Sequence, residues 1–279
     1  MLLLDDITFR YRKDFDAVVD VTAEIGPGLY LLLGENGAGK TTLLHLMCGL
    51  LFPCCGSVTL DGTDIDCRRP SSLSRIFFMS DDFECPFPTI NSLAAHHGAF
   101  YPTFNHEMLY ANLADFGLTG KEKLRSLSLG MRRKSYMAYA LALGVDILLL
   151  DEPANGMDID SKKVLRRIIA RCVGEDQTLV VSTHNIHDLG TMFDHLLLMK
   201  SGRLRVAMPM WKITGRVAFV SSSQPVDGAI YQEPDAGRFK AIVANEDGID
   251  TDIDLPLLYS AAMAPVGDLF IDFITKRDE

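Results

Sequence analysis

The sequence predicts an α/β protein whose central sheet is parallel and covered by helices on both faces. Short, nearly uninterrupted apolar runs occur at 29–33, 147–150 and 179–182, and segments with helical apolar spacing stand between them. Such runs are typical of strands buried on both faces. In addition, a glycine-rich stretch, GENGAGKT at 34–41, lies between the first such run and a helical segment. Together these features predict a parallel sheet with a ligand loop at the carboxyl end of a strand.

The N-terminal part predicts a small antiparallel β subdomain. LLLDDITFRY (2–11) has the length and composition of a strand, and GSVTLDGTDI (56–65) is typical of a hairpin with its turn at Asp61–Gly62. Between them, LYLLL (29–33) ends at Gly34, and TTLLHLMCGLL (41–51) has helical apolar spacing.

The middle of the chain predicts an inserted α-helical subdomain at about 84–135. EMLYANLADFGL (107–118) is its clearest helix, and another helix begins near SLSLGMRRK (126–134). In that second segment, the three cations at 132–134 are expected to lie on a solvated helix face.

Three strand-and-helix alternations follow. ILLL (147–150) leads to a helix from about Asp160, LVVS (179–182) precedes the helical piece IHDLGTMF (186–193), and HLLLM (195–199) precedes a turn at 201–202.

The amino-acid composition changes after about residue 205. The segment 206–279 contains 12 acidic and 6 basic residues and many turn residues. It predicts a small α+β extension, mostly β and ending in a short helix, so we divide the chain into 1–205 and 206–279.

The composition limits the class of protein. Lys and Arg number 27 against 37 Asp and Glu, and a formal charge of −10 argues against broad, nonspecific nucleic-acid binding. The six cysteines include no C-x-x-C pair, which favours reduced thiols and a cytoplasmic location. No signal peptide or apolar run of membrane-spanning length is expected, so any membrane association would come through a partner chain.

GENGAGKT fits the phosphate-loop pattern G-x-x-x-x-G-K-[ST] in its required position, after a strand and before a helix. The glycines let backbone N–H groups turn toward a phosphate, Lys40 can reach the β- and γ-phosphates, and the Thr41 hydroxyl can bind Mg²⁺. The chain is therefore predicted to be a P-loop (RecA-like) nucleotide-binding protein. The expected nucleotide contacts are Gly34, Glu35, Asn36, Gly37, Ala38, Gly39, Lys40, Thr41 and Thr42.

ILLLDEP (147–153) ends a buried strand in two carboxylates. Asp151 is expected at the edge of the sheet where ligands bind, as a ligand of Mg²⁺ or of its water shell. Glu152 can orient or deprotonate a water. The alternative for both residues is a pair of solvated acids at a strand end.

Three further motifs complete a pattern. They are, in chain order, SLSLGM (126–131), NGMD (155–158) and VVSTH (180–184). With GENGAGKT and ILLLDEP, these motifs make the chain resemble the nucleotide-binding subunit of an ABC transporter over residues 1 to about 205. The segment 101–118 followed by LSLGM is similar to ATPases that serve ABC-2-type exporters.

This resemblance implies further site residues and a dimer. Ser128 and Gly130 would contact the γ-phosphate of ATP held by a second copy of the chain, and Asp158 would lie along the interface between the copies. His184 would contact the γ-phosphate and hold the attacking water with Glu152. Tyr11 would stack on adenine. From the residues alone, Ser128 could be an ordinary helix cap, His184 a structural histidine and Tyr11 a core aromatic.

The chain departs from the family pattern at several positions. Leu129, Met131 and Ala154 replace the commoner glycine, glutamine and threonine. The glutamine expected within FFMSDDF (77–83) is absent, and Asp81 falls nearest its place. Asp81 could bind Mg²⁺ or a water, although a carboxylate supplies no N–H donor.

The resemblance implies an ATPase that powers transport, with export favoured, through a separate membrane permease. The ATPase itself would lie on the cytoplasmic face of the membrane. ATP and Mg²⁺ are the expected cofactors. Two alternatives stay open: a cytosolic ABC-type ATPase acting on nucleic acid or ribosomes, and a nucleotide switch that does not hydrolyse. Acidic charge disfavours the first alternative, and Glu152 with His184 disfavours the second.

Overall fold

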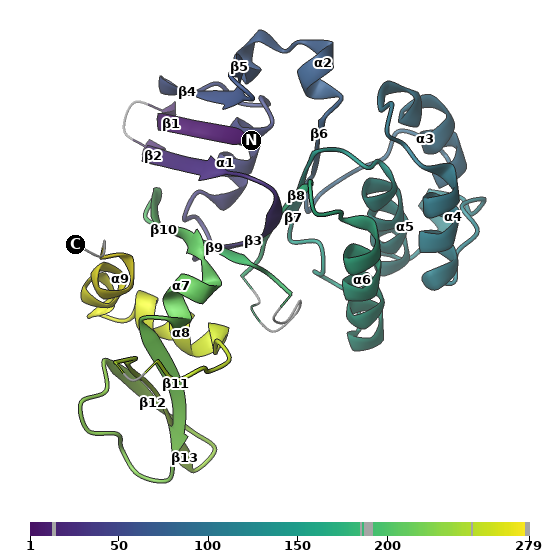
Figure 1. The fold of residues 1–279 in the computed structure, drawn as a ribbon. Coiled ribbons are helices and arrows are strands. Elements are labelled where there is room, and N and C mark those ends of the chain that lie inside the picture. Colours follow the sequence, from purple (N-terminus) through teal and green to yellow (C-terminus); the bar gives the residue numbers. More distant parts are fainter. Residues whose placement is uncertain (13–14, 185, 187–191, 247, 277–279) are drawn as a thin grey trace.

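A computed structural model describes the chain except residues 13–14, 185, 187–191, 247 and 277–279. Its strands form three sheets (Figure 1). The six-stranded sheet contains β3 (Gly28–Leu33), β6 (Ile76–Met79), β7 (Ile147–Asp151), β8 (Thr178–Ser182), β9 (His195–Lys200) and β10 (Arg203–Pro209). The four-stranded sheet contains β1 (Leu2–Arg12), β2 (Phe15–Ile25), β4 (Cys55–Leu60) and β5 (Thr63–Asp64). The three-stranded sheet contains β11 (Val217–Ser222), β12 (Tyr231–Asp235) and β13 (Arg238–Ala244).

The helices of the described residues are mostly short. The α-helices are α1 (Lys40–Met47), α2 (Pro70–Leu73), α3 (Ile90–His96), α4 (His106–Asp115), α5 (Leu129–Ala142), α6 (Ile159–Cys172), α7 (Met210–Thr214), α8 (Leu255–Met263) and α9 (Gly267–Thr275). The 3₁₀ turns are η1 (Ile65–Cys67), η2 (Gly98–Phe100) and η3 (Leu124–Ser126). Within the described ranges, no helix combines the length and the apolarity needed to cross a bilayer.

The central sheet has the order β10-β9-β3-β8-β7-β6, with β10 antiparallel to β9 and the other neighbours parallel. Side chains of β3 alternate between two cores: Leu31 and Leu33 belong to one, Tyr30 and Leu32 to the other. Burying each such leucine contributes roughly 1.5–3 kcal/mol. The predicted parallel sheet with two covered faces is therefore confirmed.

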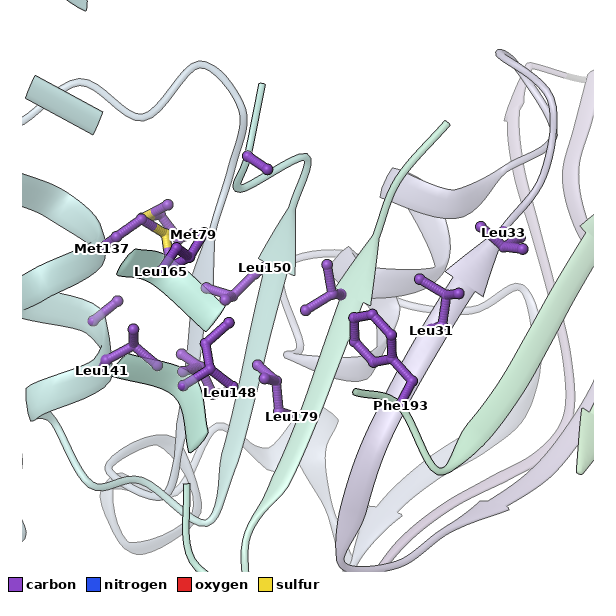
Figure 2. Close-up of a cluster of buried hydrophobic side chains, with 14 of the residues drawn as sticks. Leu31, Leu33, Met79, Met137, Leu141, Leu148, Leu150, Leu165, Leu179 and Phe193 are labelled. Carbon is purple, nitrogen blue, oxygen red and sulfur yellow. The ribbon is translucent and has the colours of Figure 1, made fainter. Parts of the chain in front are cut away.

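Different elements cover the two faces of this sheet. Helices α3 to α6 supply the core on one face, where Met137, Leu141 and Leu165 lie near Leu148 and Leu150 of β7 (Figure 2). Helix α1 and strands β1, β2 and β4 supply the core on the other face. The loops at the carboxyl ends of β3, β7 and β8 therefore emerge between two packed layers.

The N-terminal sheet is antiparallel with the order β2-β1-β4-β5. The predicted turn at Asp61–Gly62 joins β4 to β5, and both residues have positive φ, 48° and 76°, as a type I′ hairpin turn requires. Strand β2 was not predicted, although Val21, Ala23 and Ile25 are buried in alternation along it.

Helices α3 to α5 lie within or overlap the range 84–135 where an inserted helical subdomain was predicted. Side chains cap the N-termini of α3, α4, α5 and α6, from Thr89, Asn105, Ser128 and Asp158 respectively. Helix α5 runs to Ala142, beyond the 135 predicted for the insertion. The piece predicted at 186–193 lies mostly outside the described residues.

The C-terminal segment forms an antiparallel sheet of order β11-β13-β12 with two helices after it, rather than the single short helix predicted. It lies at the opposite end of the ribbon from α3 and α4 (Figure 1). The predicted boundary at 205 falls inside β10, which continues to Pro209 in the central sheet. Phe270 and Ile274 of α9 share a continuous core with Leu196 and Val206, so this segment packs directly on the central sheet.

Candidate functional site

The glycine-rich loop is held against the body of the protein by a tight turn. Gly37 and Gly39 have φ of 82° and 101°, which side-chain-bearing residues rarely adopt. A Cβ on Gly39 would lie 2.3 Å from the backbone oxygen of Ala17, so the position has no room for a side chain. Gly39 is the N-cap of α1, and the N–H groups of this helix start favour an anion.

Lys40 is buried beneath the loop. Its ammonium donates hydrogen bonds to the backbone oxygens of Gly34 at 2.7 Å and Glu35 at 3.2 Å. Burial lowers the pKa of Lys40, and the neighbouring carboxylates of Glu152 and Asp151 oppose that shift. The loop therefore carries a fixed cation that can act as a point charge on a phosphate.

Three oxygen-bearing side chains, those of Thr41, Asp151 and Ser182, meet in this region. The Thr41 hydroxyl donates to Asp151 Oδ2 at 2.7 Å, and the Ser182 hydroxyl donates to Asp151 Oδ1. Asp151 is buried at the end of β7, directly opposite Ser182 at the end of β8. A hydroxyl and a carboxylate side by side fit the hard oxygen ligands that Mg²⁺ prefers.

Glu152 and His184 form the second pair. Glu152 Oε1 lies 2.9 Å from the backbone N–H of His184 and 2.7 Å from its ring Nδ1. A carboxylate oxygen accepts hydrogen bonds, so the backbone N–H and a ring Nδ1 that carries a hydrogen can both donate to Glu152 Oε1. Glu152 has a φ of 49° and donates its backbone N–H to the backbone oxygen of Ser182 at 3.0 Å. This arrangement can orient a water.

These groups border one cleft of about 660 Å³. Tyr11 lies at its rim, half exposed, with its hydroxyl 3.2 Å from Thr42 Oγ1. The cleft is lined by Tyr11, Ala17, Asn36, Gly37, Gly39, Lys40, Thr41, Thr42, His45, Ser80, Asp81, Asp82, Asp151, Glu152, Asn155 and His184. The structure thus brings together most residues that the sequence selected, from five separate segments.

Asp81 lies in the wall of the cleft but is already engaged. Arg133 donates to its carboxylate and its backbone oxygen, and Asn155 Nδ2 lies 3.3 Å from Oδ1. Arg133 is only 8% exposed, so the prediction of a solvated helix face is wrong at this position. The reason is that its guanidinium has an acidic partner 52 residues away. Lys134 is also partly covered and pairs with Asp158 at 3.2 Å.

Ser128, Gly130 and Asp158 do not line this cleft. Ser128 caps α5, and its hydroxyl accepts a hydrogen bond from the Met131 N–H at 3.3 Å. Asp158 caps α6, and hydrogen bonds from Ser161 and Lys134 hold the pKa of its carboxyl far below the usual range. Both residues therefore act within the chain as ordinary helix caps.

Several residues of this region were not selected from the sequence: Ser182, Arg133 and Asn155, and also Ala17, His45, Ser80 and Asp82 of the cleft lining. Ser182 lies inside the VVSTH motif and Asn155 begins the NGMD motif, so these motifs could have indicated both residues as part of the site. No pattern in the sequence marked Arg133 as buried. Among the described residues, no group of three or more His, Cys, Asp and Glu side chains is arranged to hold a metal ion.

Sequence comparison identifies relatives. The ABC transporter family model matches residues 19–155. The ABC transporter ATP-binding protein NatA of Bacillus subtilis is 31% identical over 217 residues, 73% of this chain and 87% of that protein. The Nod factor export ATP-binding protein I of Cupriavidus metallidurans is 29% identical over 68% of this chain and 65% of that protein.

Solved structures share the fold. An ATP-binding subunit of an ABC transporter superposes with a TM-score of 0.68 at 19% identity, over 77% of this chain and 92% of that one. A dimeric bacterial ABC transporter cassette superposes with a TM-score of 0.65 at 22% identity, over 75% of this chain and 99% of that one.

Proposed function

The chain belongs to the ATP-binding subunits of ABC transporters and is an ATPase of that family, and we propose that it powers export through a separate membrane permease. The observation that supports ATP hydrolysis as the source of power is the convergence of the phosphate loop, the Thr41–Asp151 pair and the Glu152–His184 pair on one cleft. Binding, metal coordination and water activation could then take place within that single space.

ATP would lie with its phosphates on the loop from Gly34 to Thr42. Lys40 would place its charge on the β- and γ-phosphates, and the start of α1 would supply N–H donors. Tyr11 at the rim would stack on the adenine ring. Its half-exposed ring, held by the contact to Thr42, supports this role.

Thr41 and Asp151 would hold Mg²⁺, which would neutralise developing charge on the phosphates. Glu152 would accept a proton from the attacking water, and His184 would orient that water or the γ-phosphate through Nε2. Contacts with His184 hold the Glu152 carboxylate, so the proposed base would be positioned before the reaction begins. Asp81 is the weaker candidate for the metal because its Oδ1 accepts from Arg133.

Ser128, Gly130 and Asp158 would complete the site of a second copy. They lie outside the cleft of their own chain, and the similar cassette is dimeric, which supports a pair of copies with ATP between them. Nucleotide that contacts both copies would shift the equilibrium toward this pair.

The permease and the direction of transport are the finer part of the proposal. Export is supported by the 29% identity to the Nod factor export ATP-binding protein I. The chain would bind the cytoplasmic face of the membrane through that permease.

Purification of the tagged chain from its native membranes tests this proposal. We expect Mg²⁺-dependent ATPase activity and an integral membrane protein in the purified complex. Recovery only with ribosomes or nucleic acid would contradict the transport function. Absence of ATP hydrolysis by the complex would contradict the assignment of the cleft.

A further inference from the structure

Arg133 is a buried cation that the proposed chemistry does not use. Its Nη1 donates to the backbone oxygen of Asn155 at 2.6 Å, and its Nη2 donates to the carboxylate and backbone oxygen of Asp81. The guanidinium therefore connects helix α5 to two walls of the ATP cleft. One wall is the segment after β6, which carries Asp81, and the other is the segment after Glu152.

Two neighbouring residues place the same face of α5 on the segment 155–158. A Cβ on Gly130 would lie 3.3 Å from the backbone oxygen of Gly156, and Lys134 pairs with Asp158 at 3.2 Å. Residues 130, 133 and 134 are spaced i, i+3 and i+4, which is one face of a helix. The start of α5 is thus seated along the chain between Glu152 and α6.

An ion pair with one buried partner is weak evidence for stability, because desolvation of the Arg133 charge offsets its attraction to the partly exposed Asp81 carboxylate. An apolar residue could fill the same space. Arginine differs from an apolar residue in its planar fork, which can bind two acceptors at fixed angles. The contacts of Arg133 use that fork, since separate nitrogens bind the Asn155 and Asp81 segments.

We propose that Arg133 is a positioning residue for ATP hydrolysis and that Asp81 is its counter-ion rather than a metal ligand. Arg133 fixes the Asn155 segment, and with it the Glu152 carboxylate, relative to the start of α5 that carries Ser128 and Gly130. This inference rests on the proposed function.

A double-mutant cycle tests the inference in the full-length chain. The variants are Arg133→Met, Asp81→Asn and the pair together, with Arg133→Lys as the conservative change. Arg132→Met is the matched control, since this neighbouring cation makes none of the three contacts. For each variant, kcat, KM for ATP and the Mg²⁺ concentration for half-maximal activity are measured, and circular dichroism checks folding.

Arg133→Met and Asp81→Asn are each expected to lower kcat about 10- to 100-fold, the usual range for lost outer-shell contacts. The double variant should be no slower than the slower single variant, because both changes break one network. KM and the Mg²⁺ requirement should stay within about twofold of wild type, since neither nucleotide binding nor the metal is touched. Arg133→Lys should fall between wild type and Arg133→Met.

A higher Mg²⁺ requirement in Asp81→Asn alone would make Asp81 a metal ligand and overturn the inference. The inference would also be overturned if the two single losses of kcat multiplied in the double variant, or if kcat were unchanged in folded single variants. If Arg133→Met does not fold, Asp81→Asn and Arg133→Lys decide the matter by the same criteria. A wild-type chain without ATPase activity would instead contradict the proposed function.

Discussion

Oε1 of Glu152 lies within 2.9 Å of two nitrogens of His184, the backbone N–H and the ring Nδ1. One carboxylate oxygen is therefore held by a backbone and a side-chain group of the same residue. Because Glu152 directly follows β7 and His184 follows β8, the pairing of these two strands sets the position of the Glu152 carboxylate. The predictions below start from this pair.

Glu152→Gln should retain ATP binding and lose hydrolysis. Glutamine keeps an oxygen for the His184 N–H but cannot accept the proton of water, so kcat should fall at least about 100-fold. Phosphate release and nucleotide binding measure the two effects separately. Glu175→Gln, in the exposed turn before β8, is the control and should behave as wild type.

Lys40→Met should remove the stabilisation that ATP gives. The variant loses the point charge on the phosphates, while the apolar chain still fills the buried space under the loop. Thermal unfolding with and without Mg·ATP measures the effect, since a ligand that binds the native state raises the melting temperature. An ATP-dependent rise equal to that of wild type would contradict the role of Lys40.

Asp151→Asn and Thr41→Val should raise the Mg²⁺ concentration needed for activity by about 10-fold or more, as loss of a metal ligand does. Thr41→Ser should preserve the hydroxyl and the wild-type requirement. Titration of ATPase activity with Mg²⁺ after removal of metal by chelator measures the change. Asp160→Asn, an exposed carboxylate in the first turn of α6, is the control.

Stability should fall with rising pH through the titration of Cys48. Burial raises the pKa of this thiol from 9.0 to about 11. The contribution of the Cys48 thiol to the free energy of unfolding is therefore complete below about pH 9, where the thiol is neutral in the folded and the unfolded chain. This contribution is lost as pH rises through 11. The loss is roughly 2–3 kcal/mol for a shift of about two pKa units.

Urea unfolding of wild type and Cys48→Ala between pH 8 and 11 measures this effect. The alanine variant should lose less stability over that range, whatever its stability at pH 8. Cys54→Ala, at an exposed thiol, should follow wild type. Identical pH profiles for wild type and Cys48→Ala would contradict the prediction.

Mixing two inactive variants should restore activity if Ser128 and Gly130 serve the partner's ATP. A pair made of Lys40→Met and Gly130→Asp has one site with both changes and one site with neither. If Gly130 acts on ATP of its own chain, both sites carry a change and the mixture stays inactive. ATPase activity against the proportion of the two variants distinguishes these outcomes.

Local sequence patterns predicted the parts of the molecule that depend on local geometry. The glycines at 37 and 39 and the hairpin turn at Asp61–Gly62 require positive φ, and the apolar runs of β3, β7 and β8 require burial on both faces. These requirements are visible in the residue types themselves. The position of the cleft at the carboxyl ends of those strands follows from their parallel arrangement in the sheet.

The features that the sequence did not predict depend on distant contacts. Arg133 is buried because Asp81 and Asn155 lie opposite it, and nothing near Arg133 in the sequence indicates that pairing. Strand β10 continues past 205 because it pairs with β9 up to Pro209, although the composition changes earlier. Whether Ser128 serves as more than a helix cap depends on a second chain.

The most direct test is light scattering of Glu152→Gln with saturating Mg·ATP, in the presence of the membrane partner if the isolated chain stays monomeric. The central claim is that two copies bind face to face with ATP held between the phosphate loop of one and Ser128 of the other. We predict a mass of two ATP-binding chains. The mass should return to that of one chain when nucleotide is removed, or when Glu152→Gln and Gly130→Asp are combined in the same chain. A single ATP-binding chain under all these conditions would contradict the claim.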